Sequence, residues 1–184
     1  MPSKTIYTIG HSTRSLEEFV GLLKSNDVHA IADVRRIPKS RRHPHFADIL
    51  LASELPRRGI DYLAFTSLGG RRRGHKDSPN TGWRNESFRG YADFMQTPAF
   101  PSALHELMQQ ATKKPTAIMC AEAVPWRCHR SLISDALLVR GWKVLDIIGP
   151  AEPKVHQLTP FAHVNGITIT YPSPDEPPTL FSNS

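Results

Sequence analysis

The chain has 184 residues and a formal net charge of +6, which allows one domain with a sizeable core and favours an anionic partner. Hydrophobic residues make up 39% of the chain, but no apolar run approaches the roughly 20 residues of a transmembrane helix, so we expect no membrane partner. Because the first residues lack an apolar signal-peptide core and two cysteines cannot build a disulfide framework, we expect a cytoplasmic protein with reduced thiols.

The positive charge is concentrated in one segment. Between Arg35 and Lys76 the chain has eleven lysines and arginines but three acidic residues, whereas the remainder has slightly more acidic than basic residues. A basic segment of this kind predicts an anionic small molecule, a nucleotide or a nucleic acid as partner. The alternative is a solvated basic surface without a partner.

Strand-like and helix-like patterns alternate along the chain. The first half is predicted to contain strands at 5–10, 29–34 and 60–65, a helix beginning at a capping box of Ser15 and Glu18, and a short helix over 49–55 that ends at Pro56. A long loop rich in glycine and arginine is predicted over 68–86. The second half is predicted to contain helices over 102–111 and 131–140 and strands at 116–120, 142–148 and 167–171.

This alternation predicts an α/β fold, with a mainly parallel sheet of about five strands and helices on both faces, in a single domain over residues 1–171. Residues 172–184 are rich in proline and serine and are predicted to form a tail. Sites in such sheets lie beyond the carboxyl ends of the strands. Three predicted strands end in polar residues, which are His11 and Ser12, Asp33 and Arg35, and Cys120 and Glu122. We therefore expect these strand ends to meet in one site.

The segment 119–131 is the strongest candidate for chemistry. Cys120 ends a predicted strand, and Cys128 stands at the start of a predicted helix, whose N–H groups stabilise a thiolate or a bound anion. Three neighbouring residues are predicted to bind phosphate or carboxylate, namely Arg127, His129 and Arg130. The arrangement is similar to that of cysteine phosphatases and sulfurtransferases, although the Cys-x5-Arg spacing of those phosphatases is exceeded by one residue. The alternative for either cysteine is a small buried apolar side chain.

Acid–base roles are predicted for three other residues. Glu122 follows a buried strand and would serve as a general base, a metal ligand or the salt-bridge partner of a nearby arginine. His11, oriented by Asp33, would exchange protons, unless both residues are structural. In the predicted long loop, Arg71 and Arg72 beside two glycines would bind phosphate, or form an exposed basic loop. No cofactor is predicted, because the cysteine spacing does not match a structural zinc site, although a metal held by cysteines and histidines is an alternative.

Several short motifs occur together in a fixed order. They are TIGHS at 8–12, DVR at 33–35, LGG at 68–70, CAE at 120–122 and CHR at 128–130. The combination resembles the family known as domain of unknown function 488, over residues 5–166. The resemblance implies a small bacterial or archaeal α/β protein in which the motifs share one site, and it implies no particular reaction.

The leading hypothesis is an enzyme, a hydrolase or a transferase, that acts on a phosphorylated or nucleotide-like anion. His11, Glu122 or a cysteine would perform the chemistry, and the arginines would hold the substrate. A second hypothesis is a nucleic-acid-binding module without catalysis. A third is a metal-binding or redox-sensing thiol protein.

Overall fold

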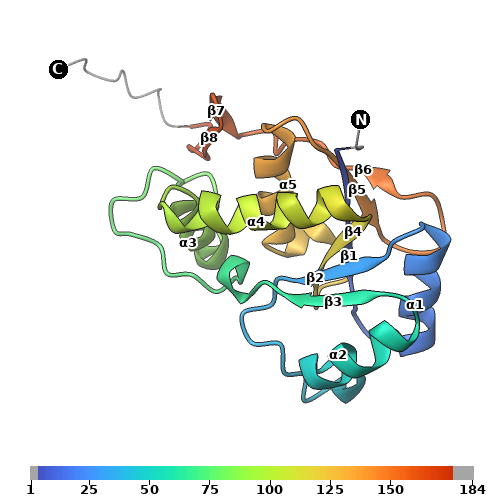
Figure 1. Cartoon of the computed structure of the whole chain (residues 1–184). Helices are drawn as coiled ribbons and strands as arrows, with labels where there is room; N and C mark the ends of the chain where they lie inside the picture. The colour runs from blue at the N-terminus through green and yellow to red at the C-terminus, as the bar shows by residue number, and fades with distance from the viewer. Residues whose placement is uncertain (1–3, 176–184) are drawn as a thin grey trace.

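The computed structural model describes residues 4–175, which form a central six-stranded sheet and a separate two-stranded one (Figure 1). The strands of the large sheet lie in the order β3-β2-β4-β1-β5-β6. The first five are parallel, and the short β6 pairs with β5 in the antiparallel sense. The strands are β1 (Thr5–Gly10), β2 (Ala30–Asp33), β3 (Asp61–Ala64), β4 (Thr116–Cys120), β5 (Lys143–Ile147), β6 (Lys154–Val155), β7 (His163–Asn165) and β8 (Thr168–Thr170). The predicted α/β fold with a mainly parallel sheet is confirmed, and β6 adds one strand.

Five α-helices and three short 3-10 helices connect the described strands. They are α1 (Leu16–Ser25), η1 (Pro44–Phe46), α2 (Asp48–Arg57), η2 (Thr66–Leu68), α3 (Glu86–Met95), α4 (Ala99–Lys113), η3 (Pro125–Arg127) and α5 (Arg130–Leu138). The predicted capping box is confirmed, since the Ser15 side chain accepts a hydrogen bond from the Glu18 N–H. Helix α2 continues through Pro56 instead of ending there, because a proline in the last turn removes only one hydrogen bond. Helix α3 was not predicted, because Gly90 at its centre weakens the helical pattern.

The helices cover both faces of the large sheet, as predicted (Figure 1). Helices α1 and α2 pack on one face, and α3, α4 and α5 pack on the other. Alternate side chains of β4 divide between them: Ala117 and Met119 face α1 and α2, whereas Ile118 and Cys120 face the other three helices. The thiol of Cys120 therefore points toward α5.

The register of the sheet aligns the carboxyl ends of its central strands. Gly10 pairs with Cys120, and Asp33 pairs with Met119. After β1 and β2 the chain runs to α1 and α2, whereas after β4 it runs to α5 on the opposite face. Doubly wound sheets bind ligands at the carboxyl edge where neighbouring connections diverge in this way. The strand ends singled out in the sequence thus meet at the place where this topology favours a site.

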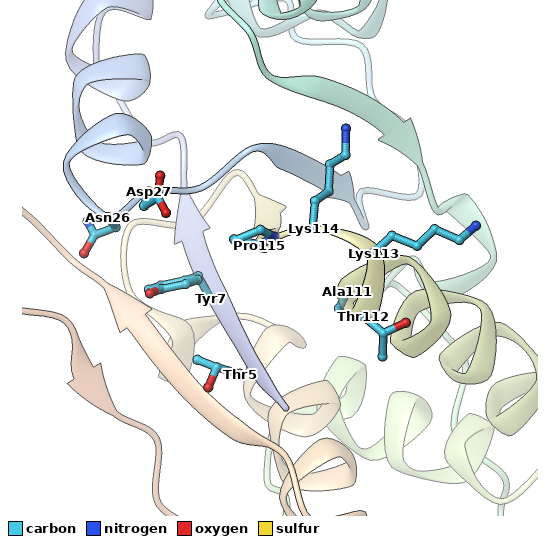
Figure 2. Close-up of a pocket in the computed structure, with 9 residues that line it drawn as sticks. All are labelled: Thr5, Tyr7, Asn26, Asp27, Ala111, Thr112, Lys113, Lys114 and Pro115. Carbon is cyan, nitrogen blue, oxygen red and sulfur yellow. The ribbon is translucent and has the colours of Figure 1, made fainter. Parts of the chain in front are cut away.

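The opposite edge of the sheet holds an open pocket of about 310 Å³ (Figure 2). Tyr7, Lys113, Lys114 and Pro115 are among its lining residues. The pocket lies at the amino ends of β1 and β4 and so does not adjoin the motif residues. Within residues 4–175, no helix combines the length and the apolar character needed to cross a membrane.

The chain after β5 is attached to α5 by a buried polar cluster. The Asp135 carboxylate accepts hydrogen bonds from Thr159 and from the Tyr171 hydroxyl, and it contacts His156 Nε2 at 2.8 Å. Strand β8 belongs to a hairpin with β7, so the strand predicted at 167–171 is present but lies outside the large sheet. Of the predicted tail, residues 176–184 lie outside the described residues.

His156 makes the stability of this attachment depend on pH. Burial opposes the charge of this imidazole, but hydrogen bonds to Asp135 and Asp146 outweigh it and raise the pKa of His156 to about 9. Since the pKa is higher in the folded than in the unfolded chain, the stabilisation is complete below the unfolded value and is lost as the pH rises through about 9. We expect the free energy of unfolding in urea to be about 3 kcal/mol smaller at pH 9.5 than at pH 6. His156→Gln should remove most of that difference, and an equal difference in this variant would contradict the assignment.

Candidate active site

The two cysteines of the chain meet under the carboxyl edge of β4. Cys120 Sγ and Cys128 Sγ are 2.6 Å apart, and the residues are 3% and 5% exposed. The loop between them returns because η3 makes a tight turn, in which Cys128 N–H donates to the Pro125 carbonyl. The helix α5 begins two residues after Cys128. A strand end and a helix start thus bring two thiols, eight positions apart in the sequence, into direct contact.

Arg130 is fully buried and donates hydrogen bonds toward both sulfur atoms of this pair. Its Nε donates to Cys120 Sγ at 3.0 Å, its Nη2 donates to the Glu122 carbonyl at 2.7 Å, and its Nη1 donates to Thr8 Oγ1 at 3.1 Å. Its backbone N–H also points at Cys128 Sγ, at 3.4 Å. Within residues 4–175 its guanidinium has no carboxylate partner at salt-bridge distance. A buried guanidinium without a carboxylate favours a nearby anion, and here the thiol pair is the group that can supply one.

The two thiols therefore differ in acidity. Burial raises the pKa of Cys128, but the hydrogen bond from Cys120 and the positive charge and backbone N–H of Arg130 outweigh burial and lower it to about 7. Burial and the contact with Cys128 raise the pKa of Cys120 well above its ordinary value. The pair thus loses its first proton near neutral pH, and Cys128 is then the thiolate and Cys120 the thiol.

His129 lies beside the Cys128 thiol and is fixed by a backbone contact. Its Nε2 lies 3.0 Å from the Val34 carbonyl, which can only accept a hydrogen bond, so the proton is on Nε2. Its unprotonated Nδ1 faces Cys128 Sγ at 3.6 Å. Burial lowers the pKa of His129, which keeps the ring neutral. The neutral imidazole can therefore accept a hydrogen bond from the Cys128 thiol at Nδ1.

Thr8 and Asp146 support Arg130 from the adjacent strands, and the sequence analysis did not identify them. They are paired in the register of β1 and β5, and Thr8 Oγ1 donates to Asp146 Oδ1 at 2.6 Å. Both side chains are buried and lie on the face that α5 covers. Polar residues inside otherwise apolar strands were the available signal, because a buried polar side chain needs a buried partner.

The end of β1 is joined to the loop after β4 by backbone hydrogen bonds. His11 N–H donates to the Cys120 carbonyl and Ser12 N–H donates to the Ala121 carbonyl, each at 2.9 Å. The contact is close enough to exclude a side chain, since a Cβ on Gly10 would lie 1.6 Å from the Glu122 carbonyl oxygen. The predicted site residues at these two strand ends therefore share one rigid edge.

His11 and Arg35 are also brought together, but not in the predicted manner. The His11 ring stacks on Phe46, and its Nε2 lies 3.5 Å from Arg35 Nη1. Burial is the main cause that lowers the pKa of His11 to about 4, so this ring is neutral at physiological pH. Asp33 does not contact the imidazole: its carboxylate accepts hydrogen bonds from Arg35 Nε and Nη2 and from the Tyr62 hydroxyl, and reaches His11 only through Arg35. The predicted orientation of His11 by Asp33 is therefore indirect.

Glu122 is exposed, and its carboxylate forms no salt bridge within the described part of the chain. Of the three roles considered for Glu122, the salt bridge with Arg35, Arg127 or Arg130 is not formed: Arg35 binds Asp33, and Arg130 uses the backbone carbonyl of Glu122. Arg72, predicted to bind phosphate, instead donates to two carbonyls of its own loop and lies over the Phe94 ring. The structure thus leaves Glu122 free of the salt-bridge role that the sequence favoured.

Three exposed arginines nevertheless lie on segments that adjoin His129. Arg71 follows Gly70, where a Cβ would lie 2.8 Å from His129 Nδ1. The Arg71 carbonyl accepts a hydrogen bond from the exposed Arg36 at 2.7 Å, and Arg127 is exposed on η3. We call Arg36, Arg71 and Arg127 the arginine rim. No group of three or more histidine, cysteine, aspartate or glutamate side chains within residues 4–175 is arranged to hold a metal ion.

Comparison with known families places this site in context. A family model described as "Domain of unknown function DUF488" matches residues 15–137, which is more than half of the chain. The chain belongs to this family. The DUF488 match contains Asp33, Cys120, Cys128 and all of α5 except its last residue, whereas Gly10 and His11 lie before it. No curated protein and no solved structure has significant similarity to the chain.

Proposed function

We propose that this DUF488 protein is an enzyme, a transferase or a hydrolase, that uses the Cys128 thiolate as its nucleophile toward an anionic substrate. Phosphorylated and nucleotide-like compounds are the proposed substrate class, and the reducing cytoplasm is the proposed location. The observation that carries the proposal is the environment of Cys128, which contacts a second thiol, the unprotonated Nδ1 of His129 and the backbone N–H of a buried arginine.

These contacts support nucleophilic chemistry because only a thiolate attacks efficiently. With a pKa of about 7, Cys128 is about half ionised at neutral pH, whereas an ordinary cysteine is only a few per cent thiolate. The Nδ1 of His129 faces the thiol and can accept a hydrogen bond from it while it is protonated. Attack on a phosphorus centre would form a thiophosphoryl bond and expel an alkoxide, which takes a proton from solvent; water would then release phosphate and restore the thiolate.

The arginine rim supports an anionic substrate. Arg130 and Arg35 were expected to bind the anion, but both direct most of their donors to groups of the protein itself. Arg36, Arg71 and Arg127 are exposed and lie beside His129 in space or in sequence. We therefore assign substrate binding to these three exposed arginines, and keep Ser12 and His11 as groups that shape the same edge.

The decisive experiment is the pH dependence of Cys128 alkylation by iodoacetamide, followed by peptide mass spectrometry. We expect Cys128 to be the faster-reacting thiol, with a midpoint near pH 7. Turnover of p-nitrophenyl phosphate should then be lost in Cys128→Ser and weakened, mainly through KM, in Arg36→Gln with Arg71→Gln. If Cys128 has a midpoint above pH 8.5, or reacts no faster than Cys120, the nucleophile is misassigned.

A second function is favoured by the same exposed arginines, namely binding of nucleic acid without catalysis. It predicts that the affinity for a single-stranded oligonucleotide falls steeply with salt, with a slope of about −0.7 for each phosphate contact. Charge reversal at Arg36 and Arg71 should weaken binding, whereas Glu122→Gln should not. Fluorescence anisotropy of the labelled oligonucleotide, measured from about 50 to about 300 mM salt, would test this prediction. Binding that does not change with salt would reject this function.

A further inference from the structure

We infer that Cys120 is the resolving thiol of Cys128, so that the site also exchanges with disulfides of low molecular weight and forms a Cys120–Cys128 disulfide. The inference rests on the proposed reactivity of Cys128 and adds a second activity at the same atoms. In the disulfide state the nucleophile is blocked, so this exchange would also switch off the transferase or hydrolase reaction.

The position of the second thiol is the first argument. A thiol that only lowers the pKa of its neighbour needs no more than hydrogen-bonding distance. Cys120 Sγ lies closer than that, at 2.6 Å from Cys128 Sγ, and the bond length in a disulfide is about 2.05 Å. Both thiols are fixed in place, one at a strand end and the other next to the start of α5. Little backbone movement is therefore needed to join them.

The chemistry of the neighbour is the second argument. A phosphoryl or acyl group on Cys128 offers Cys120 a phosphorus or carbon atom, and attack there only moves the group from one thiol to the other. A group linked through sulfur instead makes Cys128 Sγ electrophilic. Attack by Cys120 on that sulfur forms a disulfide and releases the group as a thiolate. A second thiol in contact with Cys128 can therefore complete a reaction with a sulfur-linked substrate, whereas it would not complete one with a phosphoryl or acyl substrate.

The charges at the site suit this sequence of steps. The Cys128 thiolate attacks one sulfur of RSSR, which gives Cys128–S–S–R and RS⁻. The negative charge of the Cys128 thiolate keeps Cys120 protonated. That charge is lost once Cys128 has formed the mixed disulfide. Arg130 Nε, at 3.0 Å, then stabilises the Cys120 thiolate. Cys120 attacks Cys128 Sγ and expels the second RS⁻, which takes the Cys120 proton, so RSSR is reduced to two thiol equivalents as the protein dithiol is oxidised.

The arginine rim selects among disulfides. It offers exposed cations near His129, so an anionic disulfide should react faster than a cationic one. Oxidised glutathione carries a net negative charge at neutral pH, and cystamine carries a positive charge. We expect oxidised glutathione to react at least about tenfold faster per molecule at low salt, and the ratio to shrink at high salt.

The test uses the reduced full chain, oxidised glutathione without oxygen, and intact-mass spectrometry. We expect the wild type to lose two hydrogen atoms without accumulating an adduct. Cys120→Ser should stop at one glutathionyl group on Cys128, and Cys128→Ser should stay unmodified over the same time. Circular dichroism of both variants would confirm that they are folded.

The outcomes separate this inference from the proposed function. If the wild type accumulates a stable glutathionyl adduct while Cys128 still alkylates with a midpoint near pH 7, Cys120 does not resolve and the exchange activity is wrong, but the nucleophile stands. If Cys128→Ser is modified as fast as the wild type, the attacking thiol is wrong and both proposals fail.

Discussion

Arg130→Met is expected to make Cys128 an ordinary thiol. The substitution removes the buried positive charge and the donor to Cys120 Sγ, while a side chain of similar length still fills the space. The pKa of Cys128 should then rise from about 7 to 8.5 or higher, since burial would no longer be offset. At pH 7 the thiolate fraction, and with it the alkylation rate, should fall by about tenfold or more.

The matched control is Arg130→Lys, which keeps the charge but cannot place donors on Cys120, Thr8 and Glu122 together. Its alkylation midpoint should fall between those of the wild type and Arg130→Met. Thr8→Val should shift the midpoint in the same direction by a smaller amount, because it only loosens the guanidinium. A midpoint that stays near pH 7 in Arg130→Met would show that the hydrogen bond from Cys120 alone sets the acidity.

Gly10→Ala is expected to have the largest effect on stability. The added Cβ would lie 1.6 Å from the Glu122 carbonyl oxygen and 3.0 Å from Ala123 Cα, and both are backbone atoms that cannot rotate away. The loop after β4 would have to withdraw from β1, breaking the hydrogen bonds from His11 and Ser12. We expect a loss of about 3 kcal/mol or more in the free energy of unfolding.

Gly21→Ala is the control for that measurement. Gly21 lies exposed in α1 with nothing within 4 Å of an added Cβ, so alanine should stabilise the protein by about 0.5–1 kcal/mol. Urea unfolding followed by tryptophan fluorescence would compare the two. Equal stability of Gly10→Ala and the wild type would mean that the β1 and β4 ends are not held together as described.

The fold was largely predictable because its signals are local. The strand at 116–120 is a continuous apolar run and the Ser15 cap is a short-range motif, and both occur where they were expected. The partners of buried charges were less predictable. Asp33 lies two residues from Arg35, and their mutual salt bridge occupies the Asp33 carboxylate and two nitrogen donors of Arg35. Arg130 hydrogen-bonds to Thr8, which is distant in the sequence, and only the packing of α5 on the sheet brings them together.

Whether a predicted site residue is buried or exposed decides what it can bind, and the sequence motifs do not indicate this. Arg72 and Arg71 are adjacent in a run of three arginines, yet one binds its own loop and the other is exposed. Cys120 and Cys128 were predicted as separate candidates, and their contact follows from the turn at η3. No spacing rule for the chain between them would have predicted that distance.

The order of strands in the sheet has a consequence for how the chain acquires its structure. β1 is made first but lies between β4 and β5, so Tyr7 must wait for Ala117 on one side and Leu145 on the other. Closing such long loops is entropically costly, and parallel pairing across them is slow. During synthesis the two edges of β1 stay unpaired until β4 and β5 have left the ribosome. This interval, more than the finished protein, is when self-association through exposed strands is to be expected.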